Sequence, residues 1–210
     1  MTAVRRRHWL ALGTVVLSAW VALSSAAAAP TPQQLVEDTT NQMLARLKAD
    51  RAELKAHPGR LYDLVNDIVV PHFDFVHMAH WVLGRRYWGE ASNDERARFV
   101  AAFRELLVRT YATALMQYTD QKVDFLPLRD DPASGHVTVH TQVLQSGAPP
   151  VAIDYSLYLR NGEWKVYDVA VDGISLLSNY RSSFNDEIHE TGLAQLIARL
   201  EAHNQEKSQK

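Results

Sequence analysis

The stretch VAIDYSLYLRNGEWKVYDVAV, residues 151–171, determines the fold that we expect for this chain. Apolar and polar side chains alternate on both sides of Asn161-Gly162, a dipeptide that favours the two-residue turn of a β-hairpin. Strand alternation with a period of two also occurs earlier, around Val123 and again from Val137 to Val143. The centre of the chain is therefore expected to form a meander of antiparallel strands that ends near Gly173.

A two-residue turn also fixes the register of the hairpin. It predicts three cross-strand pairs: Arg160 with Glu163, Leu157 with Val166, and Tyr155 with Asp168. In this register Asp168 lies on an apolar face, where a carboxylate can have a raised pKa and act as a general base, as in a small isomerase or dehydratase. The alternative, which we favour, is that Asp168 accepts hydrogen bonds from Tyr155 or backbone donors, because no second polar group completes a site.

The residues before and after the strands have helical periodicity. Helices are expected from the capping residue Thr31 to about His57, over residues 61–68, from Phe73 to Leu83 with Gly84 as the stop, from the capping box Ser92/Glu95 to Tyr118, and over 174–200 with a break near Gly192. Helices followed by a block of strands predict an α+β fold, with helices packed on one face of an antiparallel sheet and an N-terminal helical arm.

The N-terminus carries the features of a secretory signal. Three arginines at 5–7 precede an apolar run over 10–23, and small residues follow at 26–29. The alternative is an uncleaved anchor, but a run of about fourteen residues is short for a bilayer span. We expect a signal peptide at 1–28, a single domain at 29–203 and a polar, frayed tail at 204–210, in an exported protein.

Composition and motifs argue against the common kinds of catalytic, metal and nucleic-acid site. The chain has no cysteine, which excludes disulfides, thiolate catalysis and thiolate metal sites, and its net charge of −2 disfavours nucleic-acid binding. It lacks a phosphate-binding glycine loop, a nucleophile elbow and an H-E-x-x-H motif. Asp74, His77 and His80 share a helix face, and Arg85-Arg86 could hold a phosphate. We interpret the two histidines as ordinary, partly exposed side chains and the arginines as part of a solvated surface. We expect no metal, no cofactor and no enzymatic activity.

Apolar surface is abundant by comparison, either as a packed core or as the wall of a cavity. The candidate wall residues come from the helices and from the sheet: Met78, Val82, Phe103, Leu107, Tyr111, Leu115, Tyr155, Leu157, Val166, Ile174 and Leu177. If they bind a ligand, its release requires a helix to move against the sheet, with Gly84 and Gly173 as candidate hinges.

Four segments carry a resemblance to a known family. They are DFVHMAHWVLG (74–84), FVAAFRELLVRTYATAL (99–115), WKVYDVAVDGISLLSNYRSSF (164–184) and GLAQL (192–196). In this order they resemble the MlaC family of periplasmic phospholipid shuttles, also called the toluene-tolerance auxiliary family. The resemblance spans nearly all of the chain after the signal, with Asp172 where the family often has Glu.

The resemblance implies a roll like that of nuclear transport factor 2, with a curved sheet and an apolar pocket between sheet and helices. It implies a monomeric carrier that moves glycerophospholipid between an outer-membrane lipoprotein–porin complex and an inner-membrane ABC transporter complex. A lipid-free adaptor between such complexes is the other non-enzymatic hypothesis, and it predicts a fully packed core with one exposed apolar patch.

Overall fold

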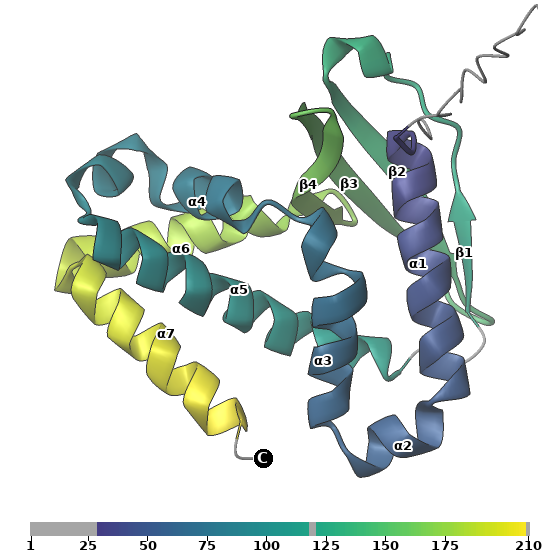
Figure 1. Ribbon diagram of the computed structural model, residues 1–210, viewed down its shortest axis with the longest axis horizontal. Coiled ribbons are helices and arrows are strands. Elements are labelled where there is room, and N and C mark those ends of the chain that lie inside the picture. Colours follow the sequence, from purple (N-terminus) through teal and green to yellow (C-terminus); the bar gives the residue numbers. More distant parts are fainter. Residues whose placement is uncertain (1–28, 118–120, 209–210) are drawn as a thin grey trace, which may run out of the picture.

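The computed structural model describes residues 29–117 and 121–208, so the expected signal peptide and Tyr118 lie outside the described residues. It has the expected α+β architecture, with a curved antiparallel sheet at one end and a group of helices at the other (Figure 1). The helices are α1 (Pro32–Ala49), α2 (Arg51–Ala56), α3 (Gly59–Ile68), α4 (Phe75–Glu90), α5 (Asn93–Leu115), α6 (Leu176–Thr191) and α7 (Leu193–Ser208), with 3-10 turns η1 (Val70–His72) and η2 (Pro132–Ser134).

The strands form the predicted meander. In the described part of the chain the sheet has five strands in sequence order, β1 (Lys122–Phe125), β2 (His136–Leu144), β3 (Val151–Arg160), β4 (Glu163–Val171) and β5 (Ile174–Ser175), each antiparallel to its neighbour. Asn161 and Gly162 form the β3–β4 turn, and both have positive φ, 52° and 82°. This geometry matches the primed turns that suit the twist of a hairpin. The sheet continues past Gly173 into the short β5, two residues further than expected.

The predicted register is correct only next to the turn. Arg160 pairs with Glu163 and Leu157 with Val166, but a β-bulge then shifts the pairing, so Tyr155 lies opposite Val169 and not Asp168. Asp168 lies opposite Ser156. An extra residue in one strand reverses which side chains face each side of the sheet beyond it. The prediction that Asp168 shares a face with Leu157, Val166 and Tyr155 is therefore wrong.

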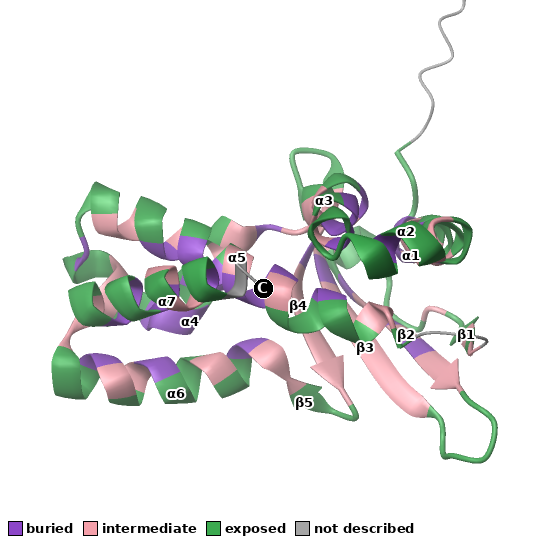
Figure 2. Ribbon diagram, turned by 90° about the horizontal axis from the view of Figure 1, so that it is seen from below, coloured by how far each residue is buried: buried purple, intermediate pink, exposed green. Residues whose placement is uncertain are grey.

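Three clusters of buried side chains support the fold. The first joins α4, α5, α6 and α7, the second joins α1, α2, α3 and α5, and the third joins α1 to strands β2, β3 and β4. Figure 2 shows α4 to α7 grouped beside the β4–β5 side of the sheet, with buried segments where these helices face one another. In contrast, α1 packs on the sheet itself. Phe73 packs against both the first and the third cluster, so these two clusters adjoin.

The expected N-terminal caps are confirmed, whereas several helix boundaries differ, among them the end of α5 at Leu115. Thr31 and Ser92 both form capping boxes, with Gln34 and Glu95 respectively. The first helix is interrupted at Asp50 and does not run unbroken to His57. Helical structure resumes after Gly84, up to Glu90. The last helix breaks at Gly192 as expected, but α7 extends to Ser208, and Asn204, expected in a frayed tail, is buried and donates to the Ala102 carbonyl at 2.9 Å.

The kink at Gly84 requires a glycine. Its backbone has φ 71° and ψ 171°, a region that residues with a side chain adopt only at a cost of about 1–3 kcal/mol. A Cβ at this position would also lie 3.2 Å from a guanidinium nitrogen of Arg181, which donates to the Trp81 carbonyl at 3.0 Å. Arg181 on α6 therefore closes the gap that the kink leaves in α4.

We expect Gly84→Ala to lower the melting temperature by about 2–12 °C, since each kcal/mol shifts a domain of this size by about 2–4 °C. Gly89→Ala in the same helix is the matched control. No other side chain or distant backbone atom lies within 4 Å of the place that its Cβ would occupy, and the substitution should be neutral or slightly stabilising. Thermal unfolding followed by circular dichroism checks both, and equal melting temperatures for the two variants would contradict the assignment.

Candidate functional site

An apolar cavity of about 310 Å³ lies where the three clusters meet, between the sheet and the helices. This volume is at the lower end of the range usual for small-molecule sites. The wall is built from α1, α3, η1, α4, α5, β3, β4 and the start of α6: Thr39, Thr40, Met43, Leu44, Val65, Val69, Val70, Phe73, Phe75, Met78, Leu107, Val108, Tyr111, Ala112, Leu115, Ile153, Tyr155, Val169, Val171 and Leu176. None of these described lining residues carries a charge.

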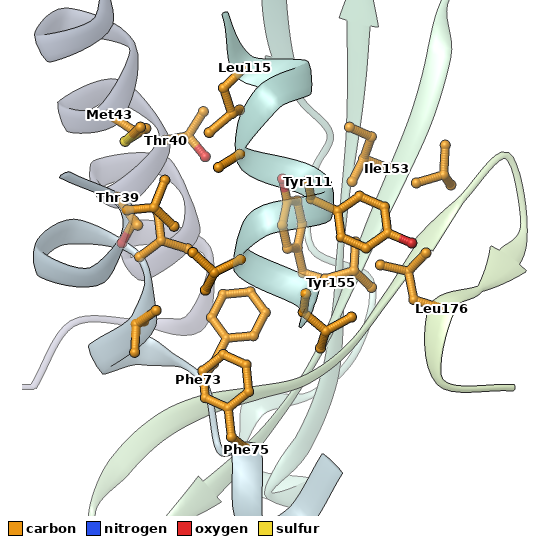
Figure 3. A pocket seen from close by; sticks show the side chains of 18 of the residues that line it. Thr39, Thr40, Met43, Phe73, Phe75, Tyr111, Leu115, Ile153, Tyr155 and Leu176 are labelled. Atoms are coloured by element: carbon orange, nitrogen blue, oxygen red, sulfur yellow. The ribbon is translucent and has the colours of Figure 1, made fainter. Parts of the chain in front are cut away.

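The polar atoms of the wall are few and belong to two threonines of α1 and two tyrosines. Figure 3 shows the rings of Tyr111 and Tyr155 near the middle of the cavity, between α1 on one side and Leu176 on the other. The Tyr155 hydroxyl forms a hydrogen bond with Thr40, and burial raises the pKa of Tyr155 to about 12. Burial likewise raises the pKa of Tyr111, aided by a hydrogen bond with Tyr180 of α6. Both hydroxyls therefore stay neutral at pH 7. That of Tyr155 links β3 to α1, and that of Tyr111 links α5 to α6.

The wall is accessible from outside. Tyr111 is 37% exposed although it lines the cavity, and most of the other lining side chains on the sheet, on α1 and at the end of α5 are only half-buried. Apolar side chains that remain this accessible in a monomer usually mark a binding surface. Such a wall can hold hydrocarbon by the hydrophobic effect. The ionisable groups among these lining residues are the two tyrosines, whose raised pKa keeps them neutral at pH 7.

Five of the eleven candidate wall residues line this cavity: Met78, Leu107, Tyr111, Leu115 and Tyr155. The structure places the others elsewhere. Val82, Phe103 and Leu177 are buried in the α4–α7 cluster, and Leu157 and Val166 in the cluster between α1 and the sheet. Ile174 is 66% exposed on β5, and Leu176, two residues further along the chain, reaches the cavity.

The remaining wall residues were not expected from the sequence. Ile153 lines the cavity because it lies on the same face of β3 as Tyr155. The bulge turns Val169 and Val171 of β4 to this face, where they pair with Tyr155 and Ile153. A signal for this was present in β4, whose apolar residues Val166 and Val169 are three apart and so break the period of two. Thr39, Thr40, and the connection from Val69 to Phe75 had no periodic signal that would mark them.

Asp168, the candidate general base, is occupied by structural hydrogen bonds. Its carboxylate accepts from the backbone N–H of Val169 at 2.8 Å, from the Ser175 hydroxyl at 2.5 Å and from the backbone N–H of Leu177 at 3.2 Å. It thus holds the start of α6 against β4, next to a helix N-terminus that favours negative charge. The favoured prediction, that Asp168 accepts structural hydrogen bonds, is confirmed for the backbone donors. Tyr155, the other expected donor, forms a hydrogen bond with Thr40 instead.

The other polar candidates also have structural partners. Arg86 bonds to Glu90 at 3.2 Å. Asp74 is 6% exposed and accepts from the backbone N–H of His77 at 2.9 Å, from the Tyr158 hydroxyl and from Arg160. Within residues 29–117 and 121–208, no three His, Cys, Asp or Glu side chains gather as a metal site would require.

The buried Asp74 makes stability depend on pH. Burial tends to raise its pKa, but the hydrogen bonds from Tyr158, His77 and Arg160 outweigh burial, and the pKa lies below its ordinary value of 3.8. A depressed folded-state pKa contributes stability that is present above about pH 4 and is lost as the pH falls through the folded value. We therefore expect the free energy of unfolding to decrease below about pH 4.

In Asp74→Asn this part of the acid dependence should disappear, and stability at pH 7 should drop by about 1–3 kcal/mol, because Tyr158, Arg160 and the helix end lose their anionic acceptor. Urea titrations of both proteins between pH 3 and 7 measure the effect. Asp63→Asn, an exposed carboxylate on α3, is the control and should follow the parent protein. If the free energy of unfolding changed with pH in the same way for Asp74→Asn and for the parent protein, Asp74 would not be the source of the acid dependence.

Comparisons with known proteins agree with this architecture. A family model described as "MlaC protein" matches residues 37–202. The intermembrane phospholipid transport system binding protein MlaC of Haemophilus influenzae is 24% identical over 204 residues, 96% of this chain and 95% of the relative. The toluene tolerance protein Ttg2D of Pseudomonas putida is 30% identical over 192 residues, 91% of this chain and 86% of the relative.

A solved structure matches as well. It is a phospholipid-binding protein of Ralstonia solanacearum in complex with a phospholipid, with a TM-score of 0.78 and 29% sequence identity, over 85% of this chain and 99% of that chain. In the part of our chain that the structure describes, no helix is both long and apolar enough to cross a membrane. The matched family model covers most of the chain and every element that lines the cavity, so the chain belongs to the MlaC protein family.

Proposed function

We propose that this protein is a phospholipid carrier whose cavity encloses acyl chains while the head group stays outside. The observation that carries the proposal is the open cavity with an uncharged, almost wholly hydrocarbon wall between the sheet and the helices. A cavity of this kind suits the methylene groups of acyl chains. It excludes the charged head group of the lipid, since a charge without a partner is costly to bury.

The energetics of lipid transfer explain why such a cavity is useful. Exposing one methylene to water costs about 0.8 kcal/mol, so two acyl chains with roughly 30 methylenes cost on the order of 24 kcal/mol. Lipid therefore does not escape from a bilayer through water at a useful rate, and a carrier must offer an apolar wall in exchange. Lipid transfer breaks no covalent bond, so an uncharged apolar wall is sufficient for it.

The relatives support the same proposal. The Haemophilus relative is named as the binding protein of an intermembrane phospholipid transport system, and the Ralstonia protein was solved with a phospholipid bound. By analogy we propose that residues 1–28 direct export to the periplasm and that residues 29–203 act as one monomeric lipid-binding unit. We further propose an outer-membrane lipoprotein–porin complex and an inner-membrane ABC transporter complex as its partners.

Mass spectrometry of an organic extract tests the proposal. Protein purified from cells without detergent should release phospholipid, and delipidated protein should take labelled phospholipid from liposomes. An extract without lipid together with no uptake would overturn the carrier proposal and favour a lipid-free adaptor. Turnover of a carbonyl substrate that depends on Asp168 would instead favour an isomerase or dehydratase.

A further inference from the structure

A second cavity, of about 590 Å³, lies behind one end of the apolar cavity. The two share three wall residues, Val70, Phe73 and Phe75, and the rings of Phe73 and Phe75 stack with their centroids 5.9 Å apart. Figure 3 shows these two rings together at one end of the apolar cavity, away from Leu115. One aromatic wall therefore separates a hydrocarbon site from the second cavity.

The second cavity differs from the first in its charge. Three cations line it, each from a different element: Arg104 of α5, Arg160 at the end of β3 and Lys165 of β4. Two carboxylates line it as well, Asp74 and Glu163. Arg160 pairs with Asp74, and Lys165 pairs with Glu163 at 3.0 Å. One positive charge, that of Arg104, remains in excess.

Arg104 has no carboxylate partner among the ion pairs of the described residues, and it donates to the amide oxygen of Asn66 at 3.2 Å. A guanidinium carries five N–H donors, so one amide leaves most of its hydrogen-bonding capacity available. Arg160 is likewise 53% exposed beyond its contact with the buried Asp74. Two guanidinium groups that border one cavity with spare donors form a suitable site for a phosphate, which accepts several charge-assisted hydrogen bonds at once.

The floor of this cavity is apolar and belongs partly to the first site. Val76, which is 53% exposed, and Val100 join the shared phenylalanines. Free inorganic phosphate gains nothing from such a floor, but a phosphate ester of an amphiphile does. A lipid with its chains in the first cavity has to place its phosphate outside that uncharged wall, and the cationic cavity lies one aromatic layer away.

We propose that the second cavity is a phosphate site for the head-group phosphate of a bound lipid, held chiefly by Arg104 and Arg160. This rests on the proposed carrier function and adds a specificity to it: the protein distinguishes a phospholipid from an uncharged diacylglycerol with the same chains. Because the cavity opens to solvent, the attraction is weakened by salt.

Calorimetry with soluble short-chain ligands tests the phosphate site. The delipidated protein is titrated at low ionic strength with dihexanoyl phosphatidylglycerol, with dihexanoylglycerol, which lacks the phosphate, and with glycerol 3-phosphate, which lacks the chains. Arg104→Glu should weaken binding of the phospholipid at least about tenfold and leave dihexanoylglycerol within about twofold. Arg104→Gln, which removes the charge without reversing it, should have a smaller effect of the same kind. Arg85→Glu, an exposed arginine outside both cavities, is the matched control and should change neither.

The arms separate the possible outcomes. If glycerol 3-phosphate is the one ligand whose binding depends on Arg104, the second cavity is a phosphate site, but its ligand is a free phosphate ester and not a lipid. If both Arg104 variants bind every phosphate ligand as the parent does, the phosphate site is overturned while the carrier function stands. If the parent binds neither dihexanoyl ligand, the carrier function is overturned. The titration with glycerol 3-phosphate then shows by itself whether the second cavity binds phosphate.

Discussion

Replacing Ile153 by aspartate is expected to empty the cavity of lipid. Ile153 is half-buried on β3, lies opposite Val171 and faces the uncharged wall. With acyl chains present, the new carboxylate would be cut off from water or forced to take up a proton, which costs several kcal/mol. Since each 1.4 kcal/mol is tenfold in affinity, the lipid that copurifies should fall at least about tenfold. Phosphorus analysis of the organic extract, per mole of protein, measures it.

The fold should tolerate this change, because a cavity open to solvent lets water reach the carboxylate once lipid is gone. Circular dichroism and thermal unfolding of delipidated protein check that the variant is folded. The matched control is Leu159→Asp on the same strand, 45% exposed and outside both cavities, which should keep the lipid content of the parent. If Ile153→Asp retains as much lipid as Leu159→Asp, the cavity is not where the chains bind.

The fold could be predicted from the sequence to the extent that local signals determine it. The turn at Asn161-Gly162, the caps at Thr31 and Ser92 and the glycine at 192 act over a few residues, and the structure confirms each of them. Errors arise where a contact between segments distant in the sequence determines the local structure. The helical segment after Gly84 is one such case, since Arg181 from α6, almost a hundred positions away, completes the kink.

The cavity was less predictable, because a half-buried side chain looks the same in sequence whether it fills a core or borders a space. Phe103 and Tyr111 belong to one stripe of α5, yet Phe103 is fully buried and Tyr111 lines the cavity. The bulge in β4 had a larger consequence. It places Val169 where the simple register predicts Asp168, and so removes a carboxylate from the wall. A carboxylate there would conflict with a site for hydrocarbon chains.

Phe103→Ala should give the opposite result to Ile153→Asp: a large loss of stability with lipid binding retained. Phe103 is 0% exposed, and its ring lies 5.7 Å from Phe99, 5.4 Å from Tyr180 and 5.9 Å from Phe184, between centroids. Removing a ring from such a cluster costs about 3–5 kcal/mol, which for a domain of this size lowers the melting temperature by about 6–20 °C. Delipidated proteins must be compared, because bound lipid itself stabilises the folded state.

Below its melting transition, Phe103→Ala should still take up labelled phospholipid from liposomes with the stoichiometry of the parent, since its ring is outside the cavity wall. Phe103→Leu, which keeps most of the volume, is the control and should melt closer to the parent. A Phe103→Ala protein that is folded but lipid-free would mean that the chains reach into the α4–α7 cluster, and that the packed helices open to admit them. A variant that melts with the parent would mean instead that the ring cluster contributes little to the fold. The two variants together thus separate the residues that enclose lipid from those that only hold the enclosure in place.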